Sequence, residues 1–178
     1  MRKILWILLI LVVVAVARLA WVMVPVSGAF ASLEETLVDQ CTRVEVAPGT
    51  EDVTIDPETR IAFVSAAERR DPSLPAGGIY ALNLDGGLNP VLVSGDAPDD
   101  FRPHGISLWS DGAGTKRLFV INHPKAGGHV VEIFDVGAGG ALTHVKGVSF
   151  DEMHSPNDLV AVSAEAFYAS NDRCHRQR

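Results

Sequence analysis

The hydrophobic positions of this chain form one continuous run at the N-terminus and many short runs after it. The first run extends from Ile4 to Val24 and is interrupted only by Arg18. As a helix it would be about 31 Å long, which matches the hydrocarbon core of a bilayer. The run has no polar face, so the pattern favours a membrane-spanning helix over a helix buried in a soluble core.

The residues that flank this run indicate its orientation. Arg2 and Lys3 precede it, which predicts that the N-terminus stays inside and that the rest of the chain lies outside the cytoplasm. The small-residue pattern Ala29-Phe30-Ala31 is typical of a signal-peptide cleavage site. We expect residues 1–31 to be a signal peptide or a membrane anchor, and the remainder to be anchored or secreted, in a periplasmic or extracellular location.

Beyond residue 32 the short runs are rich in Val, Ile and Phe and are bounded by Gly, Pro, Asn or Asp. Such runs predict β-strands. The second strand of each successive unit is expected at 61–65, 118–122 and 167–171. The third strand is expected at 78–83 and 129–135, and the fourth at 90–93 and 142–145. Gly-rich turns between them supply the positive φ angles of tight reversals.

Polar residues recur at one phase of this pattern. Glu51, His104 and Asn157 lie 53 residues apart, and each begins a dipeptide that precedes an apolar run. Four strands per repeat of about 50 residues are typical of a β-propeller blade. A β-sandwich spaces its strands similarly but gives no reason for a polar residue to return at a fixed phase. We therefore expect an all-β partial propeller of about two and a half blades in residues 32–178.

Composition and charge limit the partners of this domain. The chain is 47% hydrophobic and 21% charged, which is typical of one globular domain after the leader. Beyond residue 31 it has 12 basic and 22 acidic residues, a balance that excludes nucleic acid as a partner and suits cations. Cys41 and Cys174 have no zinc-type spacing; outside the cytoplasm they could oxidise, and the sequence leaves open whether they pair.

Two dipeptides that contain acidic residues lie just before predicted strands. Glu51-Asp52 precedes Val53, and Asn157-Asp158 precedes Leu159. Alone, each pair would be read as a turn or capping motif. Their common phase instead indicates a metal site, and oxygen donors of this kind suit calcium. We expect the two side chains of each pair to alternate across the strand entrance, as in a regular strand.

Histidines provide the candidate acid–base groups. His104 occupies the same phase as the acidic pairs, and His123 ends the neighbouring strand of its unit. Two imidazoles that lie close together can share a proton, with one acting on water while the other orients it. We interpret His129, His144, His154 and His175 as ordinary surface residues.

These motifs resemble the paraoxonase/arylesterase family of calcium-dependent lactonases. The resemblance covers most of residues 41 to 172 and rests on Cys41, Glu51-Asp52, Pro103-His104-Gly105-Ile106-Ser107, Asn122-His123-Pro124, Asn157-Asp158 and Phe167-Tyr168-Ala169-Ser170-Asn171-Asp172. It implies a six-bladed propeller with two calcium ions in its central tunnel and an N-terminal hydrophobic helix associated with membrane or lipoprotein particles. It also implies hydrolysis of small aryl esters or lactones.

The resemblance assigns roles to individual residues. Glu51 and Asn157 resemble ligands of the catalytic calcium. Asp52, Asp158 and the main-chain carbonyl of Ile106 resemble ligands of the structural calcium. His104 resembles the general base, His123 resembles its partner, and Asp172 holds in its blade the place of His123.

Some family features fall outside this sequence. Further Asn and Asp ligands of the catalytic ion come from later blades, and the partner of the cysteine that Cys41 resembles lies near the end of the full-length chain. We therefore expect an N-terminal half of such an enzyme, of doubtful activity alone, which pairs with a missing C-terminal half. The alternatives are a membrane-tethered binding module without catalysis, or a fragment of a gluconolactonase-type propeller, which needs no histidine pair.

Overall fold

The computed structural model describes residues 2–28, 31–32, 34, 36, 40–71, 73 and 77–172. The chain divides into two compact units, Met1–Arg43 and Val44–Arg178, and each is described by itself. Ala29 and Phe30 of the expected cleavage pattern lie outside the described residues, as do Cys174 and His175. Cys41 is a free, exposed thiol.

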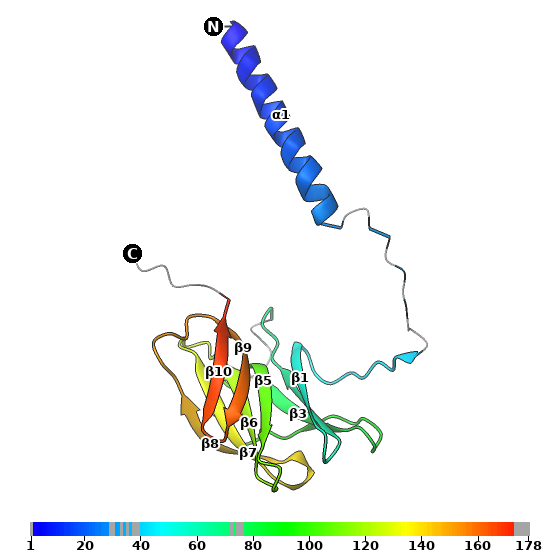
Figure 1. Ribbon diagram of the computed structural model, residues 1–178, viewed down its shortest axis with the longest axis vertical. Coiled ribbons are helices and arrows are strands. Elements are labelled where there is room, and N and C mark those ends of the chain that lie inside the picture. Colours follow the sequence, from blue (N-terminus) through cyan, green and yellow to red (C-terminus); the bar gives the residue numbers. More distant parts are fainter. Residues whose placement is uncertain are drawn as a thin grey trace. The chain divides into compact units, whose positions relative to one another are not determined.

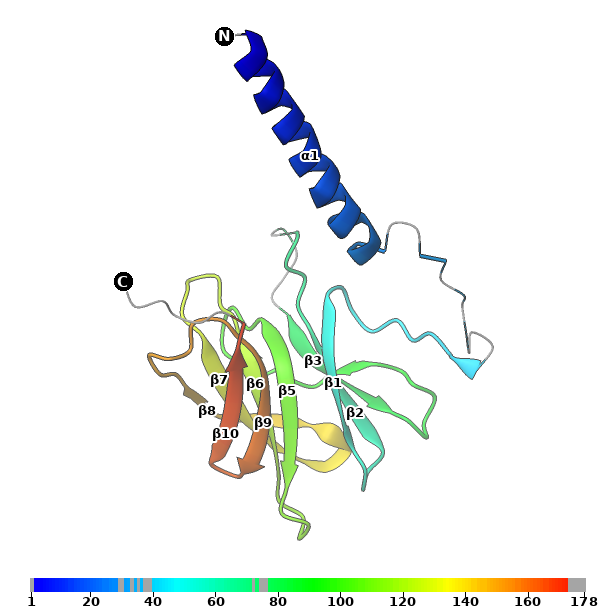
Figure 2. The same cartoon turned by 45° about the horizontal axis from the view of Figure 1, so that its top comes forward.

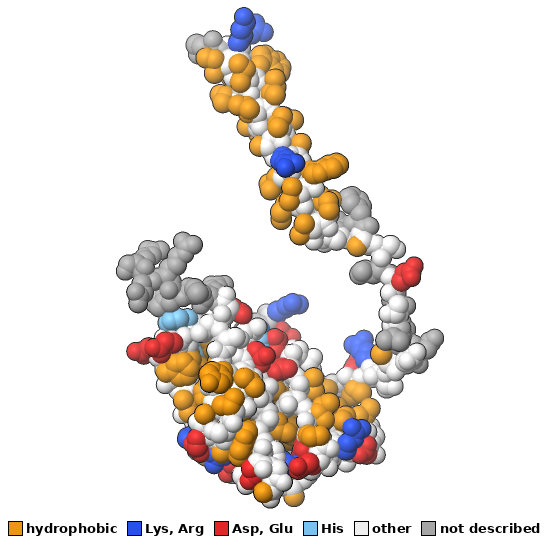
Figure 3. Space-filling view, viewed as in Figure 1, with side chains coloured by type: hydrophobic (Ala, Val, Ile, Leu, Met, Phe, Trp, Pro, Cys, Tyr) orange, Lys and Arg blue, Asp and Glu red, His pale blue; other side chains and the backbone are white. Residues whose placement is uncertain are grey.

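The first unit contains one helix, α1 (Arg2–Val26), which is long and apolar enough to cross a membrane. No side chain of α1 is buried. Figure 3 shows apolar side chains along the visible face of the helix, with basic side chains at its start and part-way along it. This arrangement is unfavourable in water, and a membrane anchor and a signal sequence would both have it.

The second unit is built of antiparallel sheets whose strands follow chain order (Figure 1). The first sheet comprises β1 (Thr50–Asp56), β2 (Ile61–Ala66), β3 (Gly78–Asn83) and β4 (Val91–Leu92). The second comprises β5 (Pro103–Ser110), β6 (Lys116–Asn122), β7 (Val130–Val136) and β8 (Leu142–Val148), with the short 3₁₀ helix η2 (Ala138–Gly140) before β8. The third pairs β9 (Pro156–Ser163) with β10 (Ala166–Asn171).

The expected strands and the all-β class are thus confirmed. The described part of the chain forms two four-stranded sheets and one two-stranded sheet. These sheets are open, and the described residues form no closed ring. β5 lies between β1 and β9, so the first strand of each sheet runs next to the first strand of the next (Figure 2).

Two apolar cores lie between the three sheets, one between each neighbouring pair, and β6 contributes to both. Leu118 and Val120 pack with Phe63 and Ile79 of the first sheet. Phe119 and Ile121 of β6 pack instead with Leu159 of β9. Because successive side chains point to opposite faces of a strand, β6 is buried on both sides and holds the stack together.

A buried ion pair also joins the first two sheets. Nζ of Lys116 lies 2.6 Å from Oδ2 of Asp56 and 2.8 Å from Oε2 of Glu58. Burial opposes ionisation of Asp56, but the hydrogen bonds from Lys116 and Thr59 outweigh it and lower the pKa of Asp56. The pair stabilises the end of β1 that is farther from Glu51, since loss of either partner would leave a buried charge uncompensated.

Two leucines on neighbouring sheets test this assignment of the core. Leu118→Ala empties a fully buried position and should lower the free energy of unfolding by about 3 kcal/mol. Leu92→Ala removes the same atoms from a side chain that is 54% exposed and should cost less than about 1 kcal/mol. Urea unfolding of the full chain in detergent, followed by circular dichroism, measures both; equal losses would contradict the placement of the core.

Candidate functional site

A β-bulge interrupts the first strand of each sheet at the recurring dipeptide. In β1 the pairing shifts between Thr50 and Val53, and in β5 it shifts between Pro103 and Ile106. In β9 it shifts opposite Ala169 and Asn171, at Asn157-Asp158. A bulge inserts one extra residue and redirects the side chains beside it. The regular alternation that we expected for these pairs is therefore wrong.

The six residues at these bulges line one pocket. Its volume is about 180 Å³, and its walls are Glu51, Asp52, His104, Gly105, Asn157 and Asp158. All three recurring dipeptides therefore meet at one place, although they come from different sheets. The phase of the repeat identified this set of residues from sequence alone.

Gly105 allows β9 to lie close to β5. A Cβ atom at this position would lie 2.5 Å from the carbonyl oxygen of Asn157 and 2.8 Å from Cα of Asp158. Both contacts are with main-chain atoms that cannot move aside easily. This contact explains why the middle repeat has glycine where the other two have aspartate.

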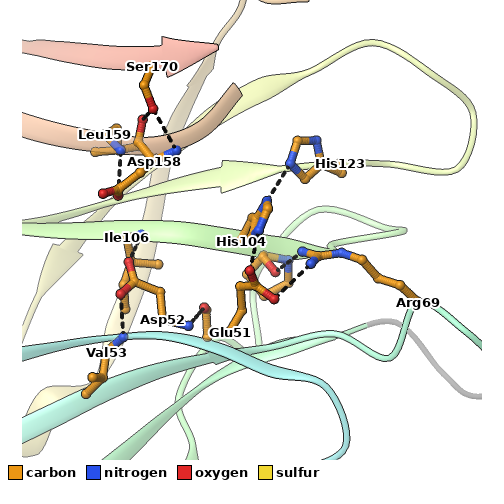
Figure 4. Close-up of polar contacts among 12 residues, drawn as sticks. Glu51, Asp52, Val53, Arg69, His104, Ile106, His123, Asp158, Leu159 and Ser170 are labelled. Atoms are coloured by element: carbon orange, nitrogen blue, oxygen red, sulfur yellow. Dashed lines mark hydrogen bonds and ion pairs between the residues drawn. The ribbon is translucent and has the colours of Figure 1, made fainter. Parts of the chain in front are cut away.

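The two aspartates make matching hydrogen bonds with the main chain. Oδ1 of Asp52 accepts from the N–H of Val53 at 2.7 Å, and Oδ1 of Asp158 accepts from the N–H of Leu159 at 2.7 Å. Oδ2 of Asp52 also accepts from the N–H of Ile106 at 2.8 Å, which links the first two sheets (Figure 4). Among the described residues, no such donor reaches the second oxygen of Asp158.

Beside the pocket, a carboxylate and three imidazoles form a continuous chain. Nε2 of His104 lies 2.6 Å from Oε1 of Glu51, and its Nδ1 lies 3.0 Å from Nε2 of His123 (Figure 4). Nδ1 of His123 in turn lies 2.7 Å from Nδ1 of His129. The interpretation of His129 as an ordinary surface residue is therefore wrong: it is half-buried and contacts the candidate acid–base pair.

Arg69 is a further member that the sequence did not indicate. Its guanidinium lies 3.2 Å from Oε2 of Glu51 and donates to the carbonyl of Pro103 at 3.1 Å. Burial raises the pKa of Glu51, but the hydrogen bond and charge of His104 and the charge of Arg69 outweigh burial and lower it. Glu51 is therefore ionised at neutral pH. Arg69 lies in the loop after β2 and has no counterpart at the repeat phase that would have revealed it.

His123 has the largest change in acidity at the site. Burial, and then the electrostatic interactions with His129, His104 and Arg69, lower the pKa of His123 to about 4. The ring is therefore neutral at pH 7. Within this arrangement both nitrogens of His104 are engaged, one with Glu51 and the other with His123.

The donor set suits a cation that prefers oxygen. Three carboxylates and the amide of Asn157 line the pocket, a combination typical of calcium sites. Within the described ranges, no three His, Cys, Asp or Glu side chains lie close enough to hold a metal by themselves. Amide and main-chain oxygens, which calcium accepts, would complete the set.

Two other residues noted in the sequence, Asp172 and His144, lie apart from the pocket. Asp172 is exposed, and its N–H donates to the carbonyl of Ser155, just as the N–H of His123 donates to that of Arg102. The main-chain equivalence of Asp172 and His123 is therefore present. His144 pairs instead with the buried Glu132, at 2.8 Å, between β7 and β8.

Comparison with known proteins gives a family for this arrangement. The arylesterase family model matches residues 75–178, which include His104, His123, Asn157 and Asp158. The chain belongs to the arylesterase family. The matched part of the chain includes β3 and β4, the second and third sheets, and two of the three bulges.

Several arylesterase relatives are similar over most of this chain. Serum paraoxonase/arylesterase 1 of Mus musculus is 31% identical over 157 residues, which is 82% of this chain and 44% of the relative. Serum paraoxonase/arylesterase 2 of Bos taurus is 35% identical over 138 residues, covering 71% and 38%. Serum paraoxonase/lactonase 3 of Homo sapiens is 33% identical over 140 residues, covering 72% and 38%. The chain spans less than half the length of these relatives.

The neutral His123 predicts that acid destabilises this arylesterase-family chain. Its pKa falls from 6.5 to about 4 on folding, so between these values the unfolded chain binds more protons than the native chain. Stability should therefore fall as pH drops through this window. In urea unfolding at about pH 7 and about pH 4.5, His123→Gln should reduce the loss on acidification. The same substitution at the exposed His154 is the control, and an unchanged loss in His123→Gln would contradict the prediction.

Proposed function

We propose that this chain provides the calcium-binding and acid–base part of a hydrolase that acts on small aryl esters or lactones. The observation that carries the proposal is the convergence of Glu51, Asp52, Asn157 and Asp158 on one pocket beside His104. Membership of the arylesterase family supports it. A larger cavity of about 450 Å³ also borders Glu51 and Arg69, and its volume suits a small ester.

In this proposal Glu51 and Asn157 hold a catalytic calcium ion. Asp52, Asp158 and the main-chain carbonyl of Ile106 hold a structural calcium ion. Calcium, when bound, polarises the carbonyl of the ester or lactone and stabilises the negative charge that develops on its oxygen. The bulges present these donors from three sheets, and the propeller that the family resemblance implies would keep them fixed around an axis.

His104 is the proposed general base and His123 its partner. Nε2 of His104 is the nitrogen beside the pocket, and in this structure it contacts Glu51. A water molecule can give a proton to Nε2 only after the carboxylate of Glu51 has turned away from it. Arg69 holds the other oxygen of Glu51 and so limits that movement.

We further propose that the domain works outside the cytoplasm. The support is α1, whose apolar side chains and preceding basic residues suit an anchor or a secretion signal. The names of the relatives include the word serum.

One feature favours a different function, a membrane-tethered binding module. Val160, Val162 and Tyr168 on β9 and β10 are 53%, 51% and 72% exposed. An open sheet with apolar side chains is a common surface for protein partners, and the C-terminal half of a longer enzyme would be one such partner. Such a module needs neither calcium nor the contact between His104 and His123. A gluconolactonase-type fragment would also not need the contact between these two histidines.

The catalytic proposal predicts calcium-dependent hydrolysis of an aryl acetate ester. The assay uses the full chain in detergent, alone and co-expressed with the part of a paraoxonase relative that follows the aligned region. His104→Gln should lower the calcium-dependent rate at least about 100-fold, since it removes the general base. His154→Gln is the matched control and should leave the rate unchanged.

Equal rates for wild type and His104→Gln would remove His104 from the mechanism. Absence of hydrolysis in every combination would favour the binding module.

A further inference from the structure

A buried carboxylate of the second sheet lies outside the lining of the candidate pocket. Glu132 on β7 is only 4% exposed, and acidic side chains are almost never buried to this extent unless they are paired. Its Oε1 accepts from Nδ2 of Asn122 on β6 at 3.0 Å, and its Oε2 lies 2.8 Å from Nε2 of His144 on β8. Both oxygens of this carboxylate therefore have partners on the neighbouring strands.

The fourth strand of the sheet fixes the position of this carboxylate. Glu132 is paired with Gly147 of β8, where a Cβ atom would lie 2.9 Å from Oε2 of Glu132. A side chain at this position would push the carboxylate away from its partners. His144 of the same strand is held in turn, because its N–H donates to Oδ2 of Asp96 at 2.9 Å. Glycine thus leaves the space for the carboxylate, and an anchored imidazole contacts one of its oxygens.

Asn122 connects Glu132 to the main chain of β5. The Oδ1 atom of Asn122 accepts from the N–H of Arg102 at 2.8 Å. A main-chain N–H can only donate, so the oxygen of the Asn122 amide must face Arg102 and its NH₂ group must face Glu132. Asn122 is 2% exposed, so these two hydrogen bonds replace those with water that the amide group loses on burial. Glu132 therefore determines how the Asn122 side chain is oriented.

These contacts lie where the bulge interrupts the pairing of β5 with β6. Asn122 is opposite Pro103, which has no N–H to donate. The peptide groups on either side of Arg102 are held instead: its N–H donates to the side chain of Asn122, and its carbonyl accepts from the N–H of His123 at 3.1 Å. His104 comes two residues after Arg102. The two hydrogen bonds therefore join the main chain beside His104 to the main chain beside His123.

We propose that Glu132 is a positioning residue which, through Asn122, keeps the imidazoles of His104 and His123 in contact. It acts through Asn122 because its own oxygens face Asn122 and His144. The inference rests on the proposed function for its role in the reaction. A general base must be held within hydrogen-bond reach of the group that it deprotonates, and buried hydrogen bonds behind the base hold it there.

Nuclear magnetic resonance of the full chain in detergent micelles tests the positioning without an assay of activity. The ring centroids of His104 and His123 lie 5.1 Å apart, so their ring protons should give a nuclear Overhauser contact in the wild type. Glu132→Leu removes the acceptor for the NH₂ group of Asn122, so this contact should be lost. Leu118→Ala, which empties a core position on β6, is the control and should keep the contact.

Kinetics of aryl acetate hydrolysis by the co-expressed protein separate positioning from packing. Glu132→Leu should lower kcat at least about tenfold, because the general base is misplaced. It should leave KM near the wild-type value, because the cavity beside Glu51 is intact. Glu132→Gln should recover the ring contact and most of kcat, since its amide oxygen can face Asn122 while its NH₂ group faces His144. Leu118→Ala should keep the wild-type kcat.

An unchanged ring contact or an unchanged kcat in a folded Glu132→Leu variant overturns the proposal, and so does an equal loss in Leu118→Ala. If Glu132→Leu does not fold, hydrogen exchange in the wild type decides. Slow exchange of the side-chain amide hydrogens of Asn122 supports the proposal, and rapid exchange overturns it. Loss of the ring contact in Glu132→Leu, with no hydrolysis by any of the proteins, would reject the proposed function and keep the positioning of the two imidazoles.

Discussion

The site depends on the extra residue that a bulge inserts in the first strand of each sheet. In regular strands, Glu51 and Asp52 would point to opposite faces, and so would Asn157 and Asp158. The bulges redirect these side chains so that both members of each pair line the same pocket. Gly105 completes the arrangement, because only a residue without Cβ allows β9 to lie this close to β5. Three sheets that share no main-chain ladder thus supply one set of donors.

The three carboxylates of the pocket differ in how many positive or hydrogen-bond-donating groups face them. Arg69 and His104 face Glu51, and two main-chain N–H groups donate to Asp52. Asp158 accepts from Leu159 and is exposed, so it is the least compensated of the three carboxylates. A cation in the pocket would relieve the repulsion among these groups, and Asp158 would gain most from it.

Much of the fold could be predicted from the sequence. The strands were predictable because short Val-, Ile- and Phe-rich runs alternate with turn residues, and β3 begins and ends where the pattern places it. The pocket residues were predictable because Glu51, His104 and Asn157 share one phase of the repeat. The bulges could not be predicted from the sequence, because a bulge changes the hydrogen-bonding register without changing the spacing of the apolar residues.

Two members of the site could not be found in this way. Arg69 reaches Glu51 from a loop, and a loop has no periodicity from which its direction could be inferred. His129 sits before β7, where a polar residue is ordinary, and its contact with His123 depends on how two neighbouring loops meet. Such contacts arise from tertiary structure, so sequence spacing alone does not predict them.

Calorimetric titration of the full chain with calcium, in detergent at neutral pH, tests the central claim most directly. The convergence of oxygen donors predicts saturable binding, which Asp158→Asn should weaken at least about tenfold because it removes a carboxylate charge from the ion. Asp151→Asn, which neutralises an exposed acid outside the pocket lining, should bind calcium like the wild type. No saturable heat in the wild type, or equal affinities in all three proteins, would contradict the account.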